Sequence, residues 1–273
     1  MPTPERHPQP WRARWQELHG DYALARTTTV VDGRPVRSLS AGEVRGLPEV
    51  VFVPGLGAPG YIAPWARAAS AWTRATVLDL PGWHHGRARA CEPTVHGLAA
   101  GIVRWLEASG KRDVILLGHS TGAQGVLRAA LLAPERLAGV VLAGPTFVPS
   151  SRTVPSLVAR ALTTLPREAG GELPAAVPSY VSSGGVPLLR LLLDAMADRP
   201  EDAAPELRAL GIPTLVTTGW RDGFAPAAWS RHLAELAGAR AVVLPGAHNA
   251  CFPYPREADA ALREAAEDWF GPA

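Results

Sequence analysis

The sequence predicts an α/β fold built on a mostly parallel, doubly wound sheet of eight strands. Apolar runs of strand length alternate along the chain with segments of helical periodicity, which is typical of a parallel sheet covered by helices on both faces. Most of these runs are apolar throughout, which indicates strands buried on both sides. Residues 146–208 interrupt the alternation and are expected to form a helical cap inserted after the sixth strand.

Eight segments are expected to form the strands. The first two flank Asp32-Gly33, a dipeptide that strongly predicts a tight hairpin. The others are short runs rich in Val, Ile, Leu and Ala. In chain order the expected strands are residues 27–31, 36–39, 49–53, 75–80, 114–118, 137–143, 213–218 and 241–244.

Helices are expected between the strands, where apolar residues recur every three or four positions. A further short amphipathic segment contains Trp11, Trp15 and Leu18. The main helical segments are residues 63–72, 95–109, 124–132, 228–237 and 257–270, with two more at 157–165 and 186–196 inside the interruption. Residues 1–145 and 209–273 are therefore assigned to one α/β core and residues 146–208 to the cap.

Composition narrows the function classes. The 273 residues are 47% hydrophobic, and 27 Lys and Arg against 25 Asp and Glu leave a formal charge of +2 with no basic stripe, so no nucleic-acid partner is expected. No apolar run reaches the roughly 18 residues of a membrane span, and the start of the chain has no signal-peptide pattern. The two cysteines, Cys91 and Cys251, lack metal-ligand spacing. These features favour a cytoplasmic protein and leave the oligomeric state open.

The fifth expected strand leads into Gly118-His119-Ser120-Thr121-Gly122, which fits the G-x-S-x-G pattern of a nucleophile elbow. A strand that turns at once into a helix holds its serine in a strained conformation and exposes the Oγ. Glycines flank the serine because larger side chains would collide across so tight a turn. The start of the following helix also directs its positive end toward developing negative charge. A Gly-rich turn between a buried strand and a helix is the alternative interpretation.

Four further motifs follow expected strands in an order similar to that of the α/β-hydrolase family. They are Pro54-Gly55-Leu56-Gly57, Asp79-Leu80-Pro81-Gly82, Gly219-Trp220-Arg221-Asp222 and Pro245-Gly246-Ala247-His248. With the elbow, the chain resembles this family from about residue 27 to residue 270, except in the cap. The resemblance implies a catalytic triad of Ser120, Asp222 and His248 in that chain order. The chemistry agrees, because a serine hydroxyl needs a histidine to accept its proton and a carboxylate to orient that histidine.

Other side chains could compete for these roles. His232 lies in a helical pattern, and His84 and His85 are interpreted as loop or pocket-wall residues. Asp79 is expected to brace its own loop. In relatives, the elbow position occupied here by His119 points away from the chemistry.

The resemblance also implies an oxyanion hole made by the backbone N–H groups of Thr121 and Leu56. Pro54 stands where relatives often have histidine, and it offers no side-chain donor to brace the Leu56 loop. The substrate pocket is expected between the cap and four aromatic side chains, each of which has ordinary core packing as its alternative role. These are Trp83, Trp220, Phe224 and Phe252.

The expected function is that of a serine hydrolase that forms an acyl-enzyme with a small to medium apolar ester, thioester or lactone. No cofactor or metal is implied, and the expected partner is a small-molecule substrate. Relatives with the same triad hydrolyse carbon–carbon bonds, carry out perhydrolysis or cyclise metabolites, and these remain alternatives. Ser120 argues against epoxide hydrolase and dehalogenase chemistry, which in relatives needs Asp at that position. A ligand-binding protein on a hydrolase scaffold, with little or no turnover, is the alternative from another class.

Overall fold

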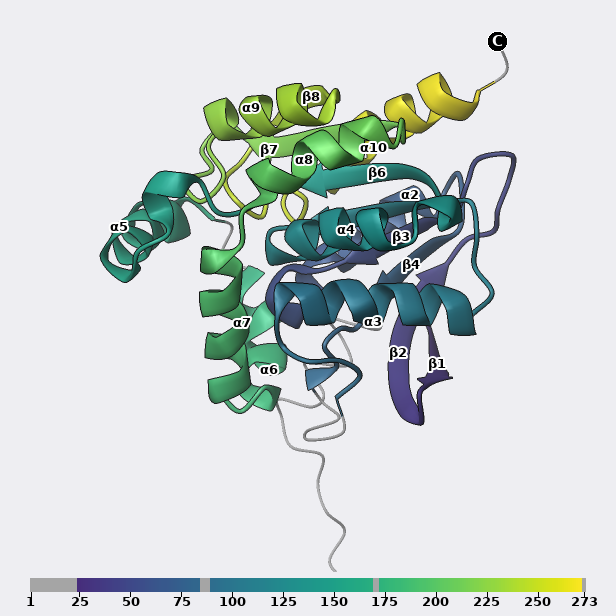
Figure 1. Cartoon of the computed structure of the whole chain (residues 1–273), viewed down its shortest axis with the longest axis horizontal. Coiled ribbons are helices and arrows are strands. Elements are labelled where there is room, and N and C mark those ends of the chain that lie inside the picture. The colour runs from purple at the N-terminus through teal and green to yellow at the C-terminus, as the bar shows by residue number, and fades with distance from the viewer. Residues whose placement is uncertain (1–23, 84–88, 169–171, 272–273) are drawn as a thin grey trace, which may run out of the picture.

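A computed structural model describes residues 24–83, 89–168 and 172–271. Its centre is one eight-stranded sheet in the order β1-β2-β4-β3-β5-β6-β7-β8 (Figure 1). All eight strands expected from the sequence are present, with ends that differ by a few residues at most. They are β1 Ala25–Val31, β2 Arg34–Ala41, β3 Val50–Val53, β4 Ala75–Leu78, β5 Val114–His119, β6 Leu137–Ala143, β7 Thr214–Gly219 and β8 Arg240–Leu244.

The sheet is antiparallel at one edge and parallel elsewhere. β1 pairs with β2 across the expected hairpin, where Asp32 and Gly33 both have positive φ angles, as a tight two-residue turn requires. β2 also runs antiparallel to β4. The remaining pairings are all parallel, so the carboxyl ends of β3 to β8 meet at one edge of the sheet. This is the edge at which doubly wound sheets gather their functional loops.

Helices cover both faces of the sheet because alternate strand residues point to opposite sides. In β5, Leu116 joins the core beneath one helical layer, and Ile115 and Leu117 join the core beneath the other. The first layer contains α3 Val95–Ala108, α4 Thr121–Leu132, α8 Pro200–Ala209 and α9 Ala227–Ala237; the second contains α2 Pro59–Ala69 and α10 Pro255–Phe270. In the part of the chain that is described, no helix is both long enough and apolar enough to cross a membrane.

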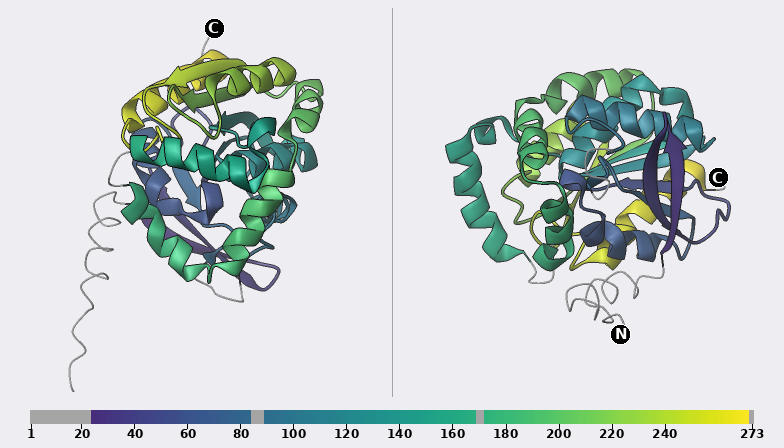
Figure 2. Two further views of the ribbon diagram at one scale, coloured as in Figure 1. Left: turned by 90° about the vertical axis from the view of Figure 1, so that its left-hand side faces the viewer. Right: turned by 90° about the horizontal axis from the view of Figure 1, so that it is seen from below.

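The chain between β6 and α8 leaves the alternating pattern, and we refer to residues 144–198 as the insertion. It contains α5 Val154–Thr164, α6 Glu172–Ser182 and α7 Val186–Ala197, with short 3-10 turns at Pro149–Ser151 and Leu165–Arg167. These helices lie at the end of the sheet toward which the β6 arrow points (Figures 1 and 2). The sequence predicted α5 and α7 but not α6.

The sequence-based boundary at residue 208 places one helix too many in the cap. α8 packs against α4 and α9 in the helical layer that covers the sheet, as an ordinary crossover helix does. Its buried side chains, Ala203, Ala204 and Leu207, belong to the core of that layer. The short amphipathic segment with Trp11, Trp15 and Leu18 lies outside the described residues.

The apolar side chains of the insertion divide into two groups. Leu157, Leu192 and Met196 pack with Phe147 and Phe224 in a small core at the carboxyl edge of the sheet. A second group is largely exposed: Val158, Leu162, Leu165 and Leu189. Only part of the apolar surface of the insertion is therefore buried against the rest of the chain.

Candidate active site

Ser120 occupies the turn between β5 and α4. Its φ and ψ are 58° and −125°, a conformation that costs a non-glycine residue on the order of 1–3 kcal/mol. The turn is so close to β3 that a side chain at Gly122 would collide with the Val53 carbonyl oxygen, and one at Gly118 would collide with Gly122 itself. The two glycines thus permit the turn, and the strained backbone lifts Ser120 from the end of the strand.

Ser120, His248 and Asp222 form a continuous hydrogen-bonded chain. His248 Nε2 lies 2.9 Å from Ser120 Oγ, and His248 Nδ1 lies 2.8 Å from Asp222 Oδ2. The three residues follow β5, β7 and β8, whose carboxyl ends are adjacent to or near one another at the same edge of the sheet. With Asp222 ionised, Nδ1 carries the proton and Nε2 is left to accept the Ser120 proton.

Asp222 is buried yet kept ionised by its surroundings. Burial by itself would raise its pKa, but the neighbouring His248 and the hydrogen bonds from His248 and Ala225 hold the pKa below its usual value. Asp222 Oδ1 accepts the backbone N–H groups of Phe224 and Ala225, each at 2.8 Å. These amides fix the carboxylate so that its other oxygen faces His248.

The loop after β3 is braced without a histidine. Gly55 N–H donates to Tyr61 Oη at 2.6 Å, and Trp83 Nε1–H donates to the Leu56 carbonyl oxygen at 2.7 Å. Leu56 itself has a φ of 47°. Tyr61 and Trp83 therefore provide the support that Pro54 cannot give.

The Leu56 amide already has a hydrogen-bond acceptor. Leu56 N–H donates to the side-chain Oγ1 of Thr121 at 2.7 Å. Thr121 is the first residue of α4, so its own backbone N–H has no acceptor within the helix by position. Leu56 and Thr121, the two residues expected to form the oxyanion hole, are therefore in contact. The contact is a hydrogen bond from the Leu56 backbone to the Thr121 side chain.

His119 links the Leu56 loop to the His248 loop. Its Nε2 lies 2.9 Å from the His248 carbonyl oxygen, and its Nδ1 lies 2.8 Å from Tyr61 Oη. Burial and the nearby His248 lower the pKa of His119 to about 3, so the ring is neutral at ordinary pH. Since a carbonyl only accepts, Nε2 carries the proton and Nδ1 accepts the Tyr61 hydroxyl proton. In relatives this position of the elbow points away from the site. Here the His119 side chain instead supports the site through its contacts with Tyr61 and the His248 carbonyl.

The four aromatic residues expected in the pocket have different environments. The Phe224 ring lies 5.1 Å from the His248 ring, and Phe224 also contacts the insertion core. Trp83 is 1% exposed and braces the Leu56 loop. Phe252 packs against the core on the α2 and α10 side. Trp220 is 58% exposed, with the Arg221 guanidinium stacked on its ring at 4.1 Å, and its place in the pocket stays a prediction.

The insertion holds both loops that carry the acid and the base. Arg160 of α5 donates to the Gly223 carbonyl oxygen at 2.7 Å, next to Asp222. Glu168 accepts the backbone N–H of His248 at 2.7 Å and that of Asn249 at 3.2 Å. A single segment of the insertion, from α5 to Glu168, therefore contacts both loops.

The competing histidines are placed elsewhere. His232 is exposed on α9 beside Trp229, while His84 and His85 lie outside the described residues. Asp79 forms an ion pair with Arg37 at 2.6 Å, which fits its expected bracing role.

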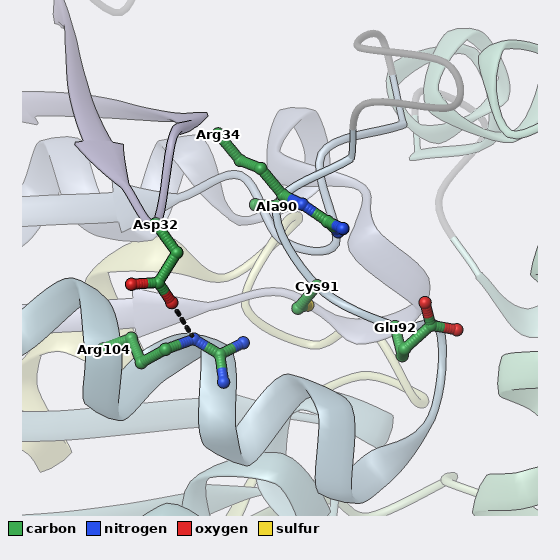
Figure 3. Close-up of a pocket in the computed structure, with 6 residues that line it drawn as sticks. All are labelled: Asp32, Arg34, Ala90, Cys91, Glu92 and Arg104. Carbon is green, nitrogen blue, oxygen red and sulfur yellow. Dashed lines mark ion pairs between the residues drawn. The ribbon is translucent and has the colours of Figure 1, made fainter.

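Cys91 and Cys251 are both buried, and neither forms a disulfide. Cys91 lines a hollow near the β1–β2 hairpin together with Asp32, Arg34, Ala90, Glu92 and Arg104 (Figure 3). Burial raises the pKa of the Cys91 thiol to about 12, and Arg104 pairs with Asp32 at 3.1 Å. Cys91 therefore stays protonated and unreactive. No group of three His, Cys, Asp or Glu residues that could hold a metal occurs among the described residues.

Residues 50–265 match the family model described as the alpha/beta hydrolase family. The chain belongs to this family. A 129-residue stretch of this alpha/beta hydrolase is 31% identical to the dihydrolipoyllysine-residue acetyltransferase component of the acetoin cleaving system of Cupriavidus necator. The match covers 46% of the chain and 33% of that protein, so the chain spans about a third of the length of this curated relative.

Solved structures of other proteins share the fold. A bacterial membrane phospholipase A is similar with a TM-score of 0.75 at 17% identity, covering 95% of this chain and 91% of that one. A thermophilic esterase from Thermogutta terrifontis is similar with a TM-score of 0.68 at 20% identity, covering 90% of this chain and 99% of that one. At these identities the likeness concerns the fold alone.

Four features of this alpha/beta hydrolase site were not predicted from its sequence. They are the Tyr61 hydroxyl, the supporting role of His119, the Thr121 side chain and the Glu168 carboxylate. His119 and Thr121 lie in the elbow motif and could have been examined there as buried polar side chains next to Ser120. Tyr61 and Glu168 carry no local signal, because only the folded chain brings them to the site.

Proposed function

We propose that the chain is a serine hydrolase that acts by acyl transfer through an acyl-enzyme. The observation that carries this proposal is the hydrogen-bonded chain from Ser120 through His248 to Asp222, with distances of 2.9 and 2.8 Å. A serine in this setting has a base within reach, and the base has an orienting carboxylate.

In the proposed reaction Ser120 Oγ attacks the substrate carbonyl carbon. The Ser120 proton passes to His248 Nε2, and the carbonyl electron pair moves onto oxygen. The Thr121 backbone N–H, at the positive end of α4, stabilises that oxygen. Collapse of the intermediate expels the leaving group, which takes the proton from His248. Water then attacks the acyl-enzyme in the same way and releases the acid.

The proposed substrates are small to medium apolar esters, thioesters or lactones. Phe224 and the small core that it shares with the insertion support an apolar environment beside His248. The similar proteins include an esterase, a phospholipase A and an acetyltransferase component, names that denote the release or transfer of acyl groups. The proposal includes a reducing, cytoplasmic setting, which the absence of a disulfide between the two buried cysteines supports.

Labelling with a fluorophosphonate tests the proposal directly, because only an activated serine reacts quickly. We expect Ser120 to be labelled at one equivalent and Ser120→Ala to be unlabelled. The same variant should lose a factor of about 10⁴–10⁶ in kcat on p-nitrophenyl esters while unfolding at the wild-type temperature. An unlabelled wild type that still binds apolar ligands would favour the ligand-binding alternative.

Substrate class is tested with a series of acyl lengths. Each substrate methylene buried in an apolar pocket contributes up to about 0.8 kcal/mol, so kcat/KM should rise with acyl length until the pocket is full. A lactone, an acyl thioester and a vinylogous diketone in the same assay separate ester hydrolysis from the alternatives with the same triad. A flat profile would contradict the apolar pocket.

A further inference from the structure

The polar groups of the Leu56 loop are already engaged. Gly55 N–H donates to Tyr61, the Leu56 carbonyl accepts from Trp83, and Leu56 N–H donates to Thr121 Oγ1 at 2.7 Å. The polar groups on either side of the Leu56 N–H, which are the Gly55 N–H and the Leu56 carbonyl, are thereby fixed. The amide cannot turn toward a substrate oxygen without first losing its bond to Thr121.

Thr121 is the residue after the nucleophile, and its hydroxyl is bound by a loop that passes against the nucleophile. Thr121 follows Ser120 directly, and a Cβ atom placed on Gly55 would lie 2.7 Å from Ser120 Cβ. The loop that reaches Thr121 Oγ1 through Leu56 thus passes against Ser120 itself. Thr121 is 1% exposed, so this hydroxyl is shielded from bulk water.

A threonine hydroxyl that accepts a hydrogen bond still has its own proton to donate. The bond from Leu56 uses Oγ1 as an acceptor. It also polarises the hydroxyl, because linked hydrogen bonds strengthen one another. Within the described chain the Leu56 amide is the hydrogen-bond partner found for this oxygen.

We propose that the Thr121 hydroxyl is a catalytic residue that donates a hydrogen bond to the oxyanion, with the Leu56 amide behind it. This inference rests on the proposed function. As the Ser120 Oγ–carbon bond forms, the Ser120 proton goes to His248 Nε2 and the carbonyl π pair goes to oxygen. Thr121 then stabilises that oxygen twice, through its backbone N–H and through Oγ1–H. The Leu56 N–H holds Oγ1 in place and does not touch the substrate.

The test compares Thr121→Val, which keeps the shape and loses the hydroxyl, with Thr121→Ser, which keeps the hydroxyl and loses a methyl group. With p-nitrophenyl butyrate we expect Thr121→Val to lower kcat by about 10²–10³-fold at nearly constant KM, and Thr121→Ser to stay within about 5-fold of the wild type. The inhibition constant of butylboronic acid, a mimic of the tetrahedral intermediate, should weaken in parallel with kcat/KM. A structural defect would not produce that parallel.

Three results would overturn the inference. Unchanged or faster turnover in Thr121→Val would mean that the hydroxyl only blocks the Leu56 amide, which would then be the donor. Equal losses in Thr121→Val and Thr121→Ser would mean that the threonine acts by packing. A wild type that is not labelled at Ser120, or a Ser120→Ala variant that remains active, would overturn the proposed function and this inference with it.

Discussion

Asp222 keeps its charge in a buried position because its two oxygens have different partners. Oδ1 accepts two backbone N–H groups, and Oδ2 faces His248 Nδ1. In Asp222→Asn the amide oxygen can still accept the two N–H groups, which leaves the amide nitrogen facing His248. That nitrogen donates, so it favours the imidazole tautomer that cannot accept the Ser120 proton.

We therefore expect Asp222→Asn to lower kcat by about 10⁴-fold with little change in KM or in unfolding temperature. Steady-state kinetics and thermal unfolding check this. Asp194 and Asp198 of the insertion are the matched controls, since they bind the Val95 amide and Arg128 instead. If Asp222→Asn were harmless and Asp194→Asn or Asp198→Asn were inactive, the acid would be misassigned.

Tyr61 joins two supports of the site through one oxygen. It accepts from Gly55 N–H and donates to neutral His119, which in turn holds the His248 carbonyl. Tyr61→Phe leaves a buried amide and a buried imidazole nitrogen without that partner, which costs roughly 1–3 kcal/mol for each group. We expect a lower unfolding temperature and a fall in kcat of about 10-fold. The exposed Tyr254→Phe is the control.

The pH dependence of kcat/KM distinguishes a change in the supporting residues Tyr61 and His119 from a change in the base, His248. Because the pKa of His119 is about 3, His119 should not titrate between pH 4 and 9. The acid limb of kcat/KM in Tyr61→Phe should therefore keep its wild-type midpoint while its height falls. A midpoint that moved would mean that the variant had altered His248 rather than its support.

At the scale of single residues, sequence reasoning reached the groups whose chemistry leaves a pattern. The glycines around Ser120 indicated a nucleophile elbow, and the resemblance to the α/β-hydrolase family implied Asp222 and His248 as its partners, which lie within hydrogen-bond distance of one another in the structure. The partner of a side chain is set by the fold, which is why the hydrogen bonds of Tyr61 and of the Thr121 hydroxyl were not predicted. Trp220 shows that an aromatic near a triad residue in sequence can still be largely exposed.

Among the elements, Glu168 is the clearest link between the insertion and the core. Its carboxylate accepts the backbone N–H groups of His248 and Asn249. Glu168→Ala removes these acceptors, so the loop after β8 should open more often and hold His248 less precisely. We expect kcat to fall by about 10-fold and hydrogen exchange of residues 245–254 to speed up.

Glu168→Gln is the variant to compare with Glu168→Ala, because glutamine keeps one acceptor oxygen. It should retain most of the activity that Glu168→Ala loses. Glu206, an exposed residue of α8, provides the control substitution to alanine. Wild-type exchange rates in Glu168→Ala would contradict the role assigned to this contact.

Elements buried on both faces were the most predictable part of the fold. β3, β5 and β7 are buried at every position because two helical layers cover them, and their sequences are accordingly rich in Val and Leu. The insertion was less predictable, since α6 contains Pro178 and α5 exposes much of its apolar side. α8 was included in the cap because residues 146–208 as a whole interrupt the alternation of strands and helices, although α8 packs as a core helix.

At the scale of the whole molecule, a hydrogen bond in the second helical layer links two residues that are 187 positions apart in the chain. Trp72 Nε1–H donates to Asp259 Oδ1 of α10 at 3.0 Å. Burial raises the pKa of Asp259 to about 6, above the value near 3.9 expected in the unfolded chain. Between these two values the folded state holds a proton that the unfolded state has lost. The contribution of Asp259 to stability therefore falls as the pH rises from about 4 to about 6.

Asp259→Asn should remove this dependence, since the asparagine oxygen still accepts from Trp72 and carries no charge. We expect the variant to be more stable than the wild type above pH 6, by on the order of 1–2 kcal/mol because Asp259 is only partly buried, and to differ less at pH 4. Urea unfolding at pH 4, 5, 6 and 7.5 measures the difference. A constant gap at all four pH values would contradict the assigned titration.

The contacts of Arg160 and Glu168 bear on how such a molecule can be altered. The same segment that lies over the site also supports the loops of Asp222 and His248. Replacing the insertion with that of another family member would remove these supports together with the old pocket wall. Chimeras of this protein should therefore inherit a new substrate range and a new rate of chemistry as one trait, unless the equivalents of Arg160 and Glu168 are transplanted too.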